Sequence, residues 1–448
     1  MNIKKFQLHS IGRFEHVEVP LAPTEQVNGN VTVFIGNNGS GKTSLLKSLA
    51  TSLSWLVSRI KTEKGSGSPI SEMAIKNGAN SSAVDISIVC DDTVSEDIQE
   101  VFWRVARTRL GRNGKYRSNL GGVDQVASCY RELLSENKNA SLPLISFYPV
   151  ERGVVDTPLK IRGKHQLGQL NGYDKKINNG VDFRRFFEWF REMEDLENES
   201  RLTENFLKEL SSKFSDSVIS TLRDLGRKME DKNLLAVRSA ISIFMPGFSD
   251  LRVSRKPYLR MLVNKDDELL NVLQLSQGEK SLMALVGDIA RRLAMLNPAL
   301  DNPLKGDGVV LIDEVDMHLH PQWQRRLIKQ LTTTFPNVQF VLTTHSPLVV
   351  SDNKDTLVYL LDGDELISCH DLYGQDVNSV LLGVMGAGIR NEEIDVQLSD
   401  LLDFIHDDDL EQAKELLAKL EQQLPDSNIE LLKASLLLRK QELRRAKN

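Results

Sequence analysis

The chain has 448 residues, of which 40% are hydrophobic and 26% charged, enough for about three domains or for one large domain with insertions. Lysine and arginine number 56 against 62 for aspartate and glutamate, and the net charge of −6 excludes a protein that binds nucleic acid over its whole surface. The three cysteines are far apart, and the sequence has neither a signal peptide nor an apolar run of membrane length, so we expect a cytoplasmic protein without disulfides, outside the membrane.

The first 120 residues are predicted to be mainly strands around one helix. Short runs of β-branched and aromatic residues are typical of strands, and they occur at 6–8, 14–19, 31–35, 84–89, 101–109 and 115–118. Leucines spaced three and four apart predict a helix from Thr43 onward. Glycine, serine, asparagine and lysine concentrate in 61–82, which we expect to be a loop, and the glycines at 111 and 114 indicate a hairpin turn.

The middle of the chain is predicted to be largely helical. A buried strand at 144–148 is followed by an irregular segment. Helical patterns then occupy 181–198, 202–229 and 233–245, and a small hairpin is expected over 248–253 and 258–263.

Helices and strands alternate beyond residue 280, which predicts an α/β sheet with parallel strands. The helices are expected at 280–296 and 322–333, and the strands at 309–312 and 339–343. A hairpin over 357–369 turns at Asp362-Gly363-Asp364. Past residue 390 the chain is charged and helical, and two helices at about 396–422 and 427–446, separated by Pro425, predict a helical hairpin.

The strongest motif is a glycine-rich loop between a strand and a helix. Ser44 follows the loop, whose residues fit the pattern G-x-x-x-x-G-K-[ST] in full. They are Gly36, Asn37, Asn38, Gly39, Ser40, Gly41, Lys42 and Thr43. Glycines allow several backbone N–H groups to point at one phosphate, and the helix N-terminus adds positive potential. Lys42 is expected to reach the β- and γ-phosphates of ATP, and the Thr43 hydroxyl to bind Mg²⁺. An ordinary glycine-rich turn is the alternative, which the combination of motif and context disfavours.

An acidic pair, Asp313 and Glu314, follows the apolar run at 309–312. A buried strand delivers its last residues to the carboxyl edge of the sheet, where ligands bind in open α/β folds. We therefore expect Asp313 to bind Mg²⁺ and Glu314 to orient or deprotonate the attacking water. Such a pair can also cap a helix, but the phosphate-binding loop favours the catalytic interpretation.

Residues 275–280, LSQGEK, resemble the signature motif of ABC-type ATPases, although Gln277 stands where the first signature glycine is usual. The resemblance implies that Ser276 and Gly278 meet the γ-phosphate of ATP bound to a partner subunit. Ser276 and Glu279 also match a capping box at a helix N-terminus. The two interpretations are compatible, because a capped helix end can still bind an anion.

Two further segments resemble the structural-maintenance, RecF and OLD-like members of the ABC-type family. Residues 314–321, EVDMHLHP, resemble their acidic residue and D-loop, which implies that Asp316 lies at the nucleotide. Asp316, His318 and His320 could instead hold a metal ion, but no fourth ligand is apparent. Residues 342–347, LTTHSP, match the switch-histidine region and imply that His345 senses the γ-phosphate. No glutamine closely follows 144–148, so the Q-loop has no assigned position.

These ordered motifs predict an α/β fold: an ABC-type P-loop ATPase head with an inserted helical region and a C-terminal helical hairpin. We expect an ATPase lobe with the phosphate-binding loop at 1–150 and a mainly helical insertion at 151–262. The second lobe, with the signature, the acidic pair and the switch histidine, is expected at 263–390, and the hairpin at 391–448.

Two segments indicate a narrower family within the ABC-type ATPases: 147–162, FYPVERGVVDTPLKIR, and 182–191, DFRRFFEWFR. Both resemble the PtuA ATPases of Septu and retron-associated anti-phage systems. That family implies a homodimer or higher oligomer formed through ATP-bound heads, and a separate HNH nuclease subunit of the PtuB type. In the retron version it also implies a reverse transcriptase whose RNA–DNA product restrains the effector. The aromatic residues of the second segment also suit a buried helix face.

Three other classes are weighed against this assignment. A long-armed DNA-repair ATPase is excluded, because strands and loops occupy much of the chain between Lys42 and Ser276. Too few residues follow His345 for the Toprim nuclease domain of OLD-type proteins, and no HNH-like histidine cluster is present. A RecF-like repair ATPase that binds DNA directly remains the alternative.

A local basic patch is the best candidate for contact with nucleic acid. Residues 101–120 contain no acidic residue, and Trp103 and Tyr116 are interleaved with six cations: Arg104, Arg107, Arg109, Arg112, Lys115 and Arg117. Such a hairpin could follow a phosphate backbone. It could equally be an edge strand protected by charge.

Overall fold

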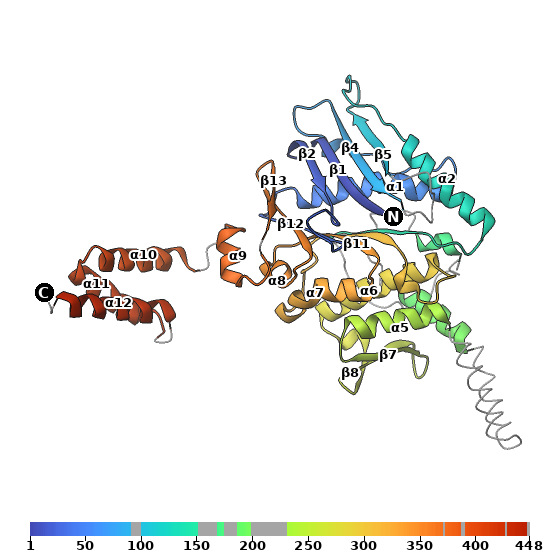
Figure 1. The fold of residues 1–448 in the computed structure, drawn as a ribbon. Helices are drawn as coiled ribbons and strands as arrows, with labels where there is room; N and C mark the ends of the chain where they lie inside the picture. Colours follow the sequence, from blue (N-terminus) through green and yellow to red (C-terminus); the bar gives the residue numbers. More distant parts are fainter. Residues whose placement is uncertain are drawn as a thin grey trace, which may run out of the picture. The chain divides into compact units, whose positions relative to one another are not determined.

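The computed structural model describes residues 1–90, 100–150, 168–173, 186–198, 231–370, 372–386, 390–425 and 428–445. The chain divides into two compact units, Met1–Gln375 and Asp376–Asn448 (Figure 1). The helix predicted over 202–229 and the irregular segment 151–167 lie outside the described residues. The finer division into 1–150, 151–262, 263–390 and 391–448 stays a prediction.

A six-stranded sheet in the order β13-β12-β3-β11-β10-β6 forms the centre of the first unit. Its strands are β3 (Val31–Gly36), β6 (Leu144–Tyr148), β10 (Gly308–Ile312), β11 (Val338–Thr343), β12 (Thr356–Asp362) and β13 (Glu365–Cys369). Each neighbouring pair is parallel except β12 and β13, which form the predicted hairpin. All residues of β3, β6, β10 and β11 are buried, as expected for parallel strands that are covered on both faces. The predicted α/β fold is confirmed.

A second, antiparallel sheet has the order β2-β1-β4-β5. It consists of β1 (Asn2–Ile11), β2 (Phe14–Pro20), β4 (Ser81–Val89) and β5 (Glu100–Thr108). Helix α1 (Lys42–Lys61) packs against strands of both sheets. The buried Gln339 side chain also joins them, because its amide donates to the carbonyls of Ile3 and Ala22 at 2.8 and 2.7 Å.

The segment after β5 differs from the predicted hairpin. Residues 115–118 form no strand, and a single bridge pairs Arg104 with Asn119. The chain then enters helix α2 (Gly121–Glu136), which the prediction omitted. Its buried residues include Val123, Val126, Ala127 and Tyr130, the spacing of one helix face.

Helices α5 (Lys232–Phe244), α6 (Gln277–Leu296) and α7 (Pro321–Thr334) lie on the side of the central sheet away from the antiparallel sheet (Figure 1). A three-stranded antiparallel sheet, β7 (Phe248–Ser254), β8 (Arg260–Lys265) and β9 (Glu268–Asn271), adds one strand to the predicted hairpin. The described part of this unit also has short helical segments: η1 (Glu72–Ala74), η2 (Gln169–Gly172), η4 (Val272–Gln274), η5 (Pro303–Lys305) and α8 (Pro347–Ser351).

The second unit contains α9 (Val377–Gly383), α10 (Glu392–His406), α11 (Leu410–Gln423) and α12 (Ile429–Arg445). The helix predicted over 396–422 is therefore two helices, and three helices share one apolar core. The break falls at an aspartate run: Asp408 has a left-handed φ of 66°, and the Asp409 carboxylate accepts from the Gln412 amide to cap α11. Aspartate favours such caps over helix interiors.

The three cysteines, all within the described ranges, form no disulfide. No helix in the described part of the chain has both the length and the apolar character needed to span a membrane.

Candidate active site

Three neighbouring parallel strands bring the predicted motifs to one edge of the central sheet. The glycine-rich loop follows β3, the acidic pair follows β10, and His345 follows β11, which lies between them. The ladder continues one residue past the strands: the Asp313 amide donates to the Tyr148 carbonyl at 2.9 Å, and the Thr344 amide to the Phe34 carbonyl at 3.1 Å. Segments far apart in the sequence thus start from fixed, adjacent positions.

The loop after β3 needs glycine at its ends. Gly41 has a φ of 99°, and a Cβ there would lie 2.7 Å from the Phe14 ring. Gly36 has a φ of 147°, and its Cβ would lie 2.6 Å from the Leu361 carbonyl oxygen. Other residues would be strained at both positions. Asn37, Asn38 and Gly39 are exposed at the tip, whereas Ser40 is buried.

Lys42 lies at the start of α1 and is 6% exposed. Its ammonium donates to the carbonyls of Gly36 and Asn37 at 2.8 and 3.0 Å and to the Ser40 hydroxyl at 3.4 Å. Burial lowers the pKa of Lys42, while the carboxylates that follow β10 oppose this shift. The cation is therefore held inside the loop, where a phosphate could replace the loop carbonyls as its partner. Thr43 and Ser44, half-buried, follow in the first helical turn.

Asp313 is fully buried at the end of β10. Its Oδ1 accepts from the Thr343 hydroxyl at 2.6 Å, but its Oδ2 is buried and has no hydrogen-bond partner in the described structure. A buried carboxylate oxygen without a donor is costly unless something else satisfies it. One carboxylate and one hydroxyl, from Asp313 and Thr43, fit Mg²⁺, which takes few protein oxygens and fills its other positions with water and phosphate.

Glu314 adopts a left-handed backbone conformation with a φ of 46°, which is uncommon outside glycine. Its amide donates to the Thr343 hydroxyl at 2.7 Å, and the Val315 amide donates to the Thr343 carbonyl at 2.9 Å. The Thr343 hydroxyl therefore contacts both Asp313 and Glu314. Thr343 is not among the predicted site residues, although it lies in the motif that contains His345. His345 itself is half-exposed directly after this segment.

Ser276 caps α6 in the predicted capping box. Its hydroxyl accepts from the Glu279 amide at 3.3 Å, and its own amide donates to the Glu279 carboxylate at 2.9 Å. Ser276 is exposed, and none of the hydrogen bonds among described residues joins it to the phosphate-binding loop. Gly278 packs against the D-loop, because a Cβ there would lie 2.4 Å from the His318 carbonyl oxygen.

The side chains of 316–324 hold the D-loop in place. Asp316 accepts from the Thr344 hydroxyl. His320 caps α7 by accepting from the Gln322 amide at 3.3 Å. Gln324, which is not among the predicted site residues, donates to the Leu319 carbonyl at 2.9 Å and accepts from the Ser346 hydroxyl at 2.8 Å. Within the described ranges no three histidine, cysteine, aspartate or glutamate side chains are grouped as ligands of a metal ion.

The predicted basic patch is smaller than its sequence indicates. Arg104 is bound to both oxygens of the Asp85 carboxylate at 2.5 Å, and Arg109 donates to the carbonyls of Ala79 and Ile75 at 2.9 and 3.0 Å. Trp103 is fully buried and cannot stack on a base. Four exposed cations remain: Arg107, Arg112, Lys115 and Arg117.

The aromatic segment that carried the narrower resemblance forms a buried helix face. Phe186 and Phe190 are fully buried in the helical residues 186–198, and the Phe186 ring lies against Gly287 of α6. Residues 151–162 and 182–185 of that resemblance lie outside the described residues. The chain beyond residue 150, where a Q-loop would follow β6, also lies outside them.

The sequence model of a family described as "AAA domain, putative AbiEii toxin, Type IV TA system" matches residues 31–351. The Retron Ec83 probable ATPase of Escherichia coli is 34% identical over 369 residues, which cover 74% of this chain and 67% of that protein. The Retron Vc95 probable ATPase of Vibrio cholerae serotype O1 biovar El Tor is 33% identical over 381 residues, covering 78% and 72%. The Septu protein PtuA of Bacillus mycoides (strain KBAB4) is 39% identical over 92 residues, which cover 20% of this chain and only 12% of that protein.

Proposed function

Because this chain belongs to the AAA-domain family matched over residues 31–351 and is a homologue of the two retron ATPases, we propose that it is the ATP-hydrolysing subunit of a bacterial anti-phage defence effector. The chain is an ATPase. The observation that supports its catalytic assignment is the convergence of three motifs on β3, β11 and β10 around the unsatisfied oxygen of Asp313.

The phosphates of ATP would bind the loop Gly36–Ser44, with its backbone amides and the Lys42 ammonium as donors. Mg²⁺, when held by Thr43 and Asp313, would neutralise charge on the β- and γ-phosphates. Lys42 would exchange its bonds to the loop carbonyls for phosphate oxygens. The loop amides and Lys42 would thus fix the position of the γ-phosphate relative to Glu314.

Glu314 would accept the proton of the attacking water, and His345 would contact the γ-phosphate. Ser276 is exposed, and its hydrogen bonds to other described residues stay within its own helix turn, which suits a residue that completes the site of a second copy. We therefore place Ser276, Gly278 and Asp316 at the ATP of a partner protomer in a homodimer or higher oligomer. Hydrolysis would then require two chains.

Thr343→Val is expected to lower kcat about tenfold with little change in KM, because a lost buried hydrogen bond costs about 1–3 kcal/mol. Valine keeps the shape but frees both Asp313 and the Glu314 amide. Steady-state ATP hydrolysis measures the effect, and Thr343→Ser should restore the rate. Thr332→Val is the matched control, since that hydroxyl donates only to carbonyls of its own helix. Equal rates for Thr343→Val and Thr332→Val would show that Thr343 does not position the acidic pair.

A second part of the proposal names the proteins with which this ATPase would assemble. The names of the matched relatives link them to retrons and to Septu, and on that basis we assign this ATPase the control of a separate HNH nuclease subunit of the PtuB type. In a retron context, a reverse transcriptase and its RNA–DNA product would hold the complex inactive. The alternative is a RecF-like repair ATPase, favoured by the four exposed cations of the basic patch.

Co-expression of the tagged chain with its flanking genes separates these two functions. A defence subunit is expected to retain an HNH nuclease through size-exclusion chromatography in a fixed ratio. A repair ATPase would purify alone and bind DNA ends, with affinity lost when Arg107, Lys115 and Arg117 are changed to glutamine. That second result would contradict the proposed function.

A further inference from the structure

Gln324 lies in the first turn of α7 and is hydrogen-bonded to two loops of the candidate active site. Its Nε2 donates to the Leu319 carbonyl of the D-loop at 2.9 Å, and its Oε1 accepts from the Ser346 hydroxyl at 2.8 Å. Ser346 belongs to residues 344–346 around His345, which we call the switch segment. A side-chain amide can donate to one loop and accept from the other at the same time, which an ionised carboxylate or an ammonium cannot.

The D-loop and the switch segment are also bonded to each other directly. The Thr344 hydroxyl donates to the Asp316 carboxylate, and the Ser346 amide donates to the Thr344 hydroxyl at 2.9 Å. Together with the two bonds of Gln324, these contacts form a closed circuit of hydrogen bonds. Because His345 lies between Thr344 and Ser346, its position and that of the D-loop depend on each other.

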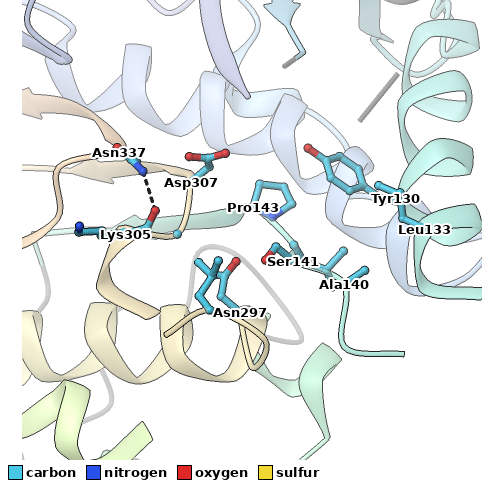
Figure 2. Close-up of a pocket in the computed structure, with 12 residues that line it drawn as sticks. Tyr130, Leu133, Ala140, Ser141, Pro143, Asn297, Lys305, Asp307 and Asn337 are labelled. Atoms are coloured by element: carbon cyan, nitrogen blue, oxygen red, sulfur yellow. Dashed lines mark hydrogen bonds between the residues drawn. The ribbon is translucent and has the colours of Figure 1, made fainter. Parts of the chain in front are cut away.

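Helix α7 holds the amide of this circuit in a fixed position. Leu327, Ile328 and Leu331 are buried along the helix. Beyond its end, the Asn337 amide donates to the Lys305 carbonyl at 2.6 Å and joins the turn before β11 to the segment before β10 (Figure 2). A side chain on such an anchored helix can position flexible loops more accurately than another loop can.

The backbone of the D-loop needs contacts that hold it. Glu314 and His318 have left-handed φ values of 46° and 64°, a conformation that is uncommon outside glycine and persists where its surroundings maintain it. The first turn of α6 packs on the same loop, since a Cβ on Gly278 would lie 2.4 Å from the His318 carbonyl oxygen. The bond from Gln324 to the next residue, Leu319, therefore also affects how the D-loop meets Gly278.

We propose that Gln324 is a positioning residue that couples the two ATP sites of an oligomer. The inference rests on the function proposed above, in which His345 contacts the chain's own γ-phosphate while Asp316 and Gly278 meet the ATP of a second copy. The Gln324 amide satisfies both loops in one relative arrangement only. A γ-phosphate that fixes His345 therefore also fixes the D-loop for the second site, and hydrolysis is cooperative in ATP.

Gln324→Leu tests the coupling, because leucine is close to glutamine in size but makes neither hydrogen bond. Steady-state hydrolysis by the wild type is expected to give a Hill coefficient for ATP well above about 1, and Gln324→Leu a value of about 1. Its kcat should fall about tenfold, as expected for lost bonds to partly buried groups. Binding of a fluorescent ATP analogue should stay within a few-fold, because the bonds of Lys42 are not part of the circuit. Gln322→Leu, at an exposed position of the same helix turn, is the matched control.

Two further variants separate coupling from a general effect on folding. Gln324→Glu can still accept from Ser346 but cannot donate to the Leu319 carbonyl, so it should lose cooperativity like Gln324→Leu. Ser346→Thr keeps the hydroxyl that bonds to Gln324 and caps α8, and it should remain cooperative. These two variants keep the test decisive even if Gln324→Leu fails to fold.

Mixed dimers of differently tagged copies locate the effect. One copy carries Glu314→Gln, so that only the ATP of the other copy is hydrolysed. Gln324→Leu in the copy with Glu314→Gln should lower this rate about tenfold, since that copy supplies the D-loop of the active site. The same substitution in the other copy should lower the rate less.

The coupling and the proposed function fail in different ways. A wild-type Hill coefficient of about 1, or Gln324→Leu kinetics equal to those of Gln322→Leu, would overturn the coupling and leave the ATPase assignment intact. A rate in mixed dimers that falls only when Gln324→Leu is in the hydrolysing copy would overturn it as well. A chain without ATP hydrolysis would contradict the proposed function and the coupling with it.

Discussion

Glu314→Gln is expected to lower kcat for ATP hydrolysis about 10²–10⁴-fold, the usual contribution of a general base. The amide of glutamine has the shape of the carboxylate but cannot take a proton from water. The groups assigned to ATP binding keep their partners, since the hydrogen bonds from Lys42 to the Gly36 carbonyl and from Thr343 to the Asp313 carboxylate do not include the Glu314 side chain. ATP affinity should therefore stay within a few-fold of the wild type.

Single-turnover hydrolysis and equilibrium binding of a fluorescent ATP analogue separate the two effects. Glu314→Gln should bind ATP, fail to turn it over and accumulate as an ATP-bound dimer on size-exclusion chromatography. Lys42→Ala provides the contrast, because it should lose affinity and remain unassociated. Glu365→Gln changes an exposed carboxylate on β13 and should behave as wild type. Unchanged turnover in Glu314→Gln would remove Glu314 from the role of base.

The central sheet and the phosphate-binding loop could be predicted because their requirements are local. Strands β3, β6, β10 and β11 are buried on both faces, so each is a mainly apolar run in the sequence without an alternating polar face. In the loop, each residue type has its own role: glycines allow the turn around the phosphate, the lysine binds phosphate oxygens, and the threonine binds Mg²⁺. Such signals need no knowledge of which strands are neighbours.

Features that depend on strand pairing could not be predicted in the same way. Thr343 reaches Asp313 and Glu314 only because β11 and β10 are adjacent. Arg104 is occupied by Asp85 because the two residues lie opposite each other on β5 and β4. In the sequence alone, Thr343 is one of two threonines before a histidine, and Arg104 is one of six cations.

Helix α6, which begins after Ser276, carries a buried charge cluster that no motif indicates. Asp288 is 1% exposed and lies between Arg291 and Arg292, which are 7% and 3% exposed. Its Oδ1 accepts from Arg291 at 2.7 Å, and its Oδ2 accepts from Arg292 at 2.6 Å and from the Tyr148 hydroxyl at 3.0 Å. Because Tyr148 ends β6 and its carbonyl binds the Asp313 amide, the cluster connects α6 to the carboxyl edge of the sheet.

Asp288→Asn is expected to lower the free energy of unfolding by about 3–5 kcal/mol, because removal of one charge from a buried ion pair leaves its partners uncompensated. Urea unfolding followed by tryptophan fluorescence measures the change, since Trp55, Trp103, Trp189 and Trp323 all lie in the unit Met1–Gln375. Asp250→Asn is the matched control: its carboxylate, 46% exposed, also pairs with an arginine, Arg252, but an exposed pair contributes at most about 1 kcal/mol. Equal midpoints for the two variants would contradict the assigned role of the cluster.

The difference in free energy of unfolding between wild type and Asp288→Asn should depend on pH, and this dependence tests its electrostatic origin. Burial alone would raise the pKa of Asp288, but the two guanidiniums outweigh burial and lower it from 3.8 to about 2. A carboxylate whose pKa is lower in the folded than in the unfolded protein stabilises the fold fully above its unfolded pKa, and this contribution is lost as pH falls toward the folded one. The gap between wild type and Asp288→Asn should therefore be constant from pH 7 to about pH 5 and begin to narrow near pH 4. A gap that already shrinks between pH 7 and pH 5 would mean that Asp288 is not held as a carboxylate by its arginines.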